Sequence, residues 1–206
     1  MKSIKLEAIP SWLITALQGL TYWVGYKRAL YRGYPLSEGA LVTELRALIH
    51  ANLPDELFLK CEVTYAKLVK DANRPTPIAG RTRADFVIAS LPEGSNSDHA
   101  RRYKPEYVVE IKRSEASDRL IDHDLARLAA FLSYRKEARA FLIILSEAHR
   151  NDRFVTEDGK TDIGKHPVPG LPGTYAIRRT VKAASAYKNK DSANYATIVE
   201  VFSGVL

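Results

Sequence analysis

The stretch YVVEIKRS, residues 107–114, places an acid and a base inside an otherwise apolar run. Residues two apart on a strand point to the same face of a sheet, so Glu110 and Lys112 would lie side by side. Val109 and Ile111 would face the other way. An isolated pair of this kind is usually an exposed salt bridge, so any other role depends on acids supplied by neighbouring elements.

The segments around this strand follow a definite order. Runs rich in β-branched and aromatic residues predict strands, and apolar residues three and four apart predict helices. The expected elements are one or two helices over 11–32, a helix over 38–52, strands over 56–69, 81–91 and 105–114, a helix over 117–138 and a strand over 138–147. A polar, Gly- and Pro-rich loop then covers 147–173, and two strands, 174–185 and 195–204, complete the pattern.

This order predicts an α/β fold with a mixed central sheet flanked by helices. The chain of 206 residues fits one main domain with an appended element. We expect residues 1–36 to form an N-terminal helical extension and residues 37–206 to form the domain.

The composition favours a basic cytoplasmic protein. A formal net charge of +7 and a pI near 9.4 favour a polyanionic partner such as nucleic acid. Cys61 is the only cysteine, which excludes an internal disulfide and a zinc site built from cysteines. Gln18 and Thr21 interrupt the apolar stretch 9–26, and no cleavage pattern follows it, so we expect neither a membrane span nor a secretory signal.

A second acid lies on the strand that precedes YVVEIKRS. Asp85 falls in the run RADFVIA, and neighbouring strands lie about 5 Å apart, so Asp85 and Glu110 could share a divalent cation. Two close carboxylates repel each other unless a positive charge neutralises them, and a hard cation with oxygen ligands provides that charge.

The helix over 38–52 offers a third acid. Glu38 falls near the middle of the apolar stripe of this helix, so we expect it to point inward at the helix start. It would either cap its own helix or join the acidic cluster. Glu44 lies about 100° to one side of the stripe and is the alternative, with a solvated position as its ordinary role.

These residues and their order resemble the PD-(D/E)xK nuclease superfamily, which has the restriction-endonuclease-like fold. The resemblance covers roughly residues 37–146 and rests on Asp85, on Glu110-Ile111-Lys112 and on the order αβββαβ. Ala84 stands where the motif has proline. The segment LPEGSNSDHARRYK lengthens the connection between the two motif strands.

The resemblance implies an endonuclease that hydrolyses phosphodiester bonds in DNA with Mg²⁺, for which Mn²⁺ could substitute. Asp85, Glu110 and the Ile111 carbonyl would hold the metal, and Lys112 would orient or help deprotonate a water. Glu38 would bind the metal through water or help place a second ion. The alternative is a non-catalytic nucleic-acid-binding or assembly module with the same fold.

Basic residues supply candidate contacts to a nucleic-acid backbone, although each segment alone is typical of a solvated surface. The candidates are Arg81, Arg83, Arg101, Arg102, Lys104, Arg178, Arg179, Lys182, Lys188 and Lys190. His123 and Arg127, one helical turn apart, are expected to form a surface pair. A homodimer could form through the aromatic N-terminal helices or a sheet edge.

Overall fold

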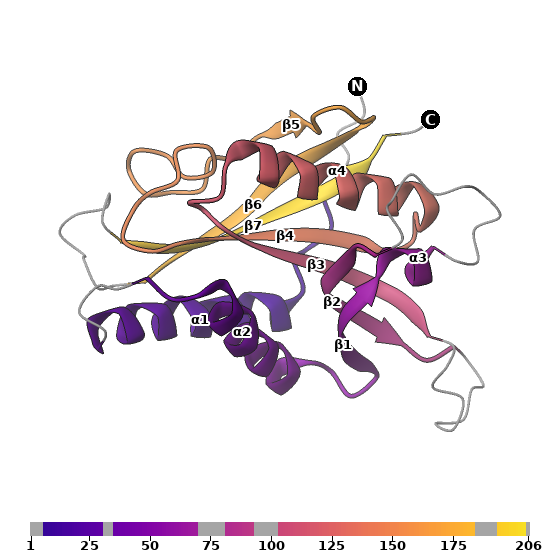
Figure 1. Ribbon diagram of the computed structural model, residues 1–206, viewed down its shortest axis with the longest axis horizontal. Helices are drawn as coiled ribbons and strands as arrows, with labels where there is room; N and C mark the ends of the chain where they lie inside the picture. Colours follow the sequence, from indigo (N-terminus) through magenta and orange to yellow (C-terminus); the bar gives the residue numbers. More distant parts are fainter. Residues whose placement is uncertain (1–5, 31–34, 70–80, 93–102, 184–192, 205–206) are drawn as a thin grey trace.

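The computed structural model describes residues 6–30, 35–69, 81–92, 103–183 and 193–204 (Figure 1). The helices are α1 (Ser11–Leu30), α2 (Glu38–Asn52), α3 (Tyr65–Leu68) and α4 (Asp118–Tyr134). The strands are β1 (Leu57–Thr64), β2 (Arg83–Ser90), β3 (Lys104–Arg113), β4 (Arg139–Ser146), β5 (Lys165–Pro167), β6 (Gly173–Ala183) and β7 (Asn194–Ser203).

The seven strands form one mixed sheet in the order β1-β2-β3-β4-β7-β6-β5. Strands β3 and β4 pair in parallel, because α4 carries the chain back along the sheet between them, and the other neighbouring pairs are antiparallel. Figure 1 shows α1 and α2 on one face of the sheet and α4 on the other. The predicted α/β fold with a mixed sheet flanked by helices is confirmed.

Strand β3 separates two hydrophobic clusters by the alternation of its side chains. Val108 packs into the cluster formed with α4, whereas Val109 and Ile111 pack into the cluster formed with α1 and α2. β3 is thus covered on both faces. Glu110 shares the α4 face with Val108, and it is buried there with 4% of its surface exposed.

Helix α1 contributes directly to the second cluster. Leu13, Leu17 and Leu20 are fully buried among residues of α2 and of the sheet. The segment expected as a helical extension therefore shares a core with the domain that follows it. Among the described helices, none is both long enough and apolar enough to cross a membrane.

Two segments differ from the sequence predictions in detail. The strand expected over 56–69 ends at Thr64, and Tyr65–Leu68 turns into the short helix α3, whose first amide donates to the Thr82 carbonyl. The loop expected over 147–173 contains β5 and an isolated bridge between Val155 and Thr161. These elements are too short to produce a periodic apolar pattern in the sequence.

If α1 belongs to the core, its buried leucines stabilise the whole fold. We expect Leu17→Ala to lower the free energy of unfolding by about 2–5 kcal/mol, because it removes buried apolar volume. Tyr22→Ala is the matched control, because Tyr22 lies on the same helix with 75% of its surface exposed. Urea denaturation followed by circular dichroism compares the variants. Equal midpoints for Leu17→Ala and the wild type would contradict a shared core.

Candidate functional site

The pairing of β2 with β3 ends just before Asp85 and Glu110, the two predicted metal-binding acids. Their ladder extends from Ser90 and Lys104 to Phe86 and Val109, and Asp85 is the next residue of β2. There the carboxylate Oδ2 of Asp85 accepts the Ile111 N–H group at 2.7 Å. A side chain thus replaces the backbone acceptor that a continued ladder would have supplied.

This hydrogen bond also indicates where the Ile111 carbonyl lies. The N–H and C=O groups of one strand residue point toward the same neighbouring strand. Because the Ile111 N–H points to Asp85, its carbonyl is directed to the same edge of β3. Asp85 and the Ile111 carbonyl, two of the predicted metal ligands, therefore lie where the pairing of β2 with β3 ends, a place named here the opening between β2 and β3.

Glu110 is held by residues from two helices on the α4 face. The Tyr65 hydroxyl, at the start of α3, donates to Glu110 Oε1 at 2.6 Å. The Arg127 guanidinium, on α4, donates from Nη1 to the same oxygen at 3.3 Å. Both contacts fix the orientation of the carboxyl group in a buried position.

Burial and the neighbouring acid raise the pKa of Glu110 to about 8. Burial has the larger effect and the charge of Asp85 adds to it, while the Tyr65 hydrogen bond and the Arg127 charge oppose it. Burial also raises the pKa of Asp85, against the hydrogen bonds from Ile111 and Glu110 that lower it. Glu110 therefore keeps its proton at neutral pH, and a further positive charge would be needed to ionise it beside Asp85.

Lys112 lies on the same face as Glu110 and extends to α4. Its Nζ is 3.2 Å from Asp124 Oδ2, and Asp124 Oδ1 accepts Arg127 Nη2 at 2.7 Å. Burial alone would lower the pKa of Lys112. The negative charges of Asp124, Glu38 and Asp85 raise it by more than burial lowers it, so the net shift of the pKa is upward. Lys112 is thus a charged donor in this arrangement, suited to orient a water or phosphate.

The prediction that Glu38 points inward is wrong. Glu38 is exposed at the start of α2, because the buried stripe of this helix begins one turn later with Leu41. The N-cap is Ser37, whose hydroxyl accepts the Ala40 N–H at 3.2 Å. The charge of Glu38 is among those that raise the pKa of Lys112, whereas Glu44 is half-buried and is not among those main charges.

Sequence reasoning missed three residues of this network: Tyr65, Asp124 and Arg127. The expected surface pair of His123 and Arg127 is wrong in part, because Arg127 has only 15% of its side chain exposed and reaches Glu110. It does contact His123, with Nη2 2.9 Å from Nδ1. One signal was present, since Asp124 interrupts the buried apolar stripe of α4.

The basic residues predicted to contact a nucleic-acid backbone differ in how exposed they are. Arg81, Arg83, Lys104 and Arg179 are exposed, with Arg83 3.9 Å from Glu62 and Lys104 3.0 Å from Glu106, and Lys182 is half-buried. Arg101, Arg102, Lys188 and Lys190 lie outside the described residues.

Arg178 does not fit the prediction of a free phosphate contact. A register shift between Ile177 and Arg179 places it at an irregularity in β6, and its guanidinium pairs with the buried Glu200 and with the Glu7 carbonyl. Arg178 therefore has a structural role at the sheet.

Arg113, which alternation turns away from Lys112, binds Glu147 at 3.2 Å and the Leu36 carbonyl. These contacts fix the chain before α2 to the end of β4. Arg113 thus points away from the face of Glu110 and Lys112.

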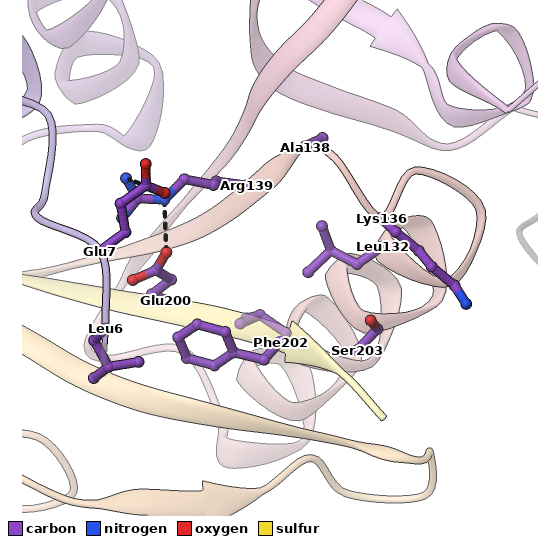
Figure 2. Close-up of a pocket in the computed structure, with 10 residues that line it drawn as sticks. Leu6, Glu7, Leu132, Lys136, Ala138, Arg139, Glu200, Phe202 and Ser203 are labelled. Atoms are coloured by element: carbon purple, nitrogen blue, oxygen red, sulfur yellow. Dashed lines mark hydrogen bonds and ion pairs between the residues drawn. The ribbon is translucent and has the colours of Figure 1, made fainter. Parts of the chain in front are cut away.

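A cavity of about 380 Å³ lies elsewhere, near the start of β4 and the end of β7. Figure 2 shows Arg139 facing Glu200 on its wall, and their ion pair is 2.8 Å long. In the parallel ladder of β3 and β4, Arg139 lies opposite Tyr107, which precedes Glu110 by three residues. None of the candidate catalytic residues lines this cavity.

The oxygen atoms at the opening between β2 and β3 are the possible ligands of a metal ion. In the described part of the chain, no group of three or more His, Cys, Asp or Glu side chains is arranged to hold one. An ion would depend on Asp85, Glu110, the Ile111 carbonyl and water. Mg²⁺ commonly binds in this way, through one or two carboxylates with several retained waters.

Comparisons with known proteins do not identify a relative of the chain. No protein-family model matches the chain, and neither curated proteins nor solved structures contain a significant match.

The raised pKa of Glu110 makes stability depend on pH. Between its ordinary value of 4.5 and about 8, the folded chain keeps a proton that the unfolded chain releases. The free energy of unfolding should therefore fall as pH rises through this interval, by up to about 1.4 kcal/mol per pH unit, and level off above it.

Glu110→Gln removes this titrating group and should flatten the decline. Urea denaturation of both proteins at pH 5, 6, 7 and 8 measures the difference. Parallel declines in the two proteins would contradict a buried, protonated Glu110.

Proposed function

We propose that the chain is a metal-dependent endonuclease that cleaves DNA, with a restriction-endonuclease-like core and with Mg²⁺, or Mn²⁺ in its place, as the cofactor. One observation carries the proposal: the Asp85 carboxylate binds the Ile111 amide at 2.7 Å, beside Glu110 and at the point where β2 and β3 separate. Two carboxyl groups and a backbone carbonyl then converge on one opening. An acidic pair with one buried and one partly buried member needs a cation to be fully ionised.

Each residue has a role that its surroundings support. Asp85, Glu110 and the Ile111 carbonyl would hold the metal, which when bound offsets developing charge on a phosphate and lowers the pKa of a bound water. Lys112 would direct its ammonium group toward that water or a phosphate oxygen. Glu38, exposed at the start of α2, would bind through water.

DNA binding would depend on exposed cations around the acidic site. Arg81 and Arg83 lie exposed just before Asp85, and the chain carries a net charge of +7. Contacts to phosphates give affinity without sequence readout. The proposal extends to a cytoplasmic location and to a homodimer. The dimer would form through α1, where Tyr22, Tyr26 and Leu30, spaced four residues apart, form an exposed apolar stripe.

A second function is favoured by a different observation. The charges of Lys112, Asp124 and Arg127 satisfy one another within the protein, and Glu110 accepts from Tyr65 and Arg127. A closed network of this kind also suits a structural role. The alternative is therefore a nucleic-acid-binding or assembly module that does not cleave.

The nuclease proposal predicts loss of cleavage when any one of its three central side chains is changed. We expect Asp85→Asn and Glu110→Gln to abolish cleavage of plasmid DNA in Mg²⁺, because each removes a metal ligand. Lys112→Met should reduce the rate about 100-fold or more, because a positioned donor is lost. Glu106→Gln, on the same strand but at its other end, is the matched control and should retain activity.

Calorimetric titration with Mg²⁺, combined with the cleavage assay, separates the two functions. Metal binding with cleavage supports the nuclease, and metal or DNA binding without cleavage supports the module. Full activity in all three site variants would reject the assignment of these residues.

A further inference from the structure

Arg127 contacts an acid of the sheet and an acid of α4 at the candidate site. One guanidinium nitrogen lies 3.3 Å from Glu110 Oε1, and the other lies 2.7 Å from Asp124 Oδ1. The second nitrogen is also 2.9 Å from His123 Nδ1. His123 and Asp124 belong to the same helix as Arg127, so they would keep the guanidinium at the site if its contact with Glu110 broke.

The Arg127 charge acts against a cation at Glu110. A divalent ion held by Asp85 and Glu110 would lie next to a guanidinium that already contacts Glu110. Like charges repel strongly in a partly buried site, where solvent screens them less than in water. Tyr65 contacts the same oxygen but carries no charge, so it orients Glu110 without opposing a metal.

The guanidinium also has the geometry of a phosphate ligand. Its planar set of donors matches phosphate oxygens, often through two parallel hydrogen bonds. Arg127 is only partly exposed, with 15% of its side chain accessible, so a phosphate would have to approach the opening itself to reach it. A scissile phosphate bound to the metal would do so.

We propose that Arg127 couples metal binding to substrate binding, an inference that rests on the proposed function. Without metal, the guanidinium stays on Glu110. When a cation binds to Asp85 and Glu110, the guanidinium turns from Glu110 to a phosphate oxygen of the DNA, while Asp124 retains it. Arg127 therefore weakens metal binding in the free protein, and a bound phosphate removes that effect, as reciprocal coupling requires.

Calorimetric titration of the full chain with Mn²⁺, without DNA, tests the first half of this coupling. We expect Arg127→Met to bind Mn²⁺ about fivefold more tightly than the wild type, because one repelling charge is gone. Arg127→Lys keeps the charge and should stay near the wild-type affinity. Arg119→Met, which removes a positive charge from an exposed position on the same helix, is the control for net charge.

The second half is tested with a phosphorothioate DNA duplex in the presence of Mn²⁺. Arg127→Met should bind this duplex more weakly than the wild type, although it binds the metal more tightly. The salt dependence of DNA binding should fall by about one phosphate contact. A purely structural role for Arg127 would not produce opposite changes in the two affinities.

The outcomes separate the inference from the function on which it rests. If Arg127→Met binds Mn²⁺ no more tightly than the wild type, while wild-type binding is lost in Asp85→Asn, the inference is overturned and the metal site stands. If the wild type binds no Mn²⁺, both are overturned. Circular dichroism checks folding, and Arg127→Gln replaces Arg127→Met should the latter unfold.

Discussion

The hydrogen bond from the Ile111 amide to the Asp85 carboxylate is the interaction on which the site depends. It closes the end of the β2–β3 ladder with a side chain instead of a carbonyl, so the two strands can separate without leaving the Ile111 amide unpaired. An unsatisfied buried amide would cost roughly 1–3 kcal/mol. The same contact brings Asp85 beside Glu110 and so creates the acidic pair whose burial raises both pKa values.

The two cores explain why such a pair can be held in place. β3 is packed on one face against α1 and α2 and on the other against α4, so Val109 and Ile111 anchor the strand while Glu110 and Lys112 reach the α4 side. α4 then supplies the partners that the sheet lacks, Asp124 and Arg127. Fixing these side chains from both layers maintains the orientation of the site.

The strand and helix order, the alternation on β3 and the pairing of β2 with β3 could be predicted from the sequence, because period-two and period-3.6 patterns are local. The contact of Arg127 with Glu110 could not, because the rotation and height of α4 over the sheet are set by tertiary packing. Glu38 was misplaced because its helix extends past the core at its first turn. Arg178 was misjudged because its partners, Glu200 and the Glu7 carbonyl, lie far from it in the sequence.

Charge explains how one network can suit both proposed functions. With a proton on Glu110, the negative charges of Asp85 and Asp124 are matched by Lys112 and Arg127, so the metal-free site is compensated within the protein. A divalent cation that replaces the proton leaves an excess positive charge at the opening. A phosphate is the ligand that would neutralise this excess, so metal and nucleic acid would support each other's binding at the site in either function. The distinction between enzyme and module therefore depends on whether that binding is followed by cleavage.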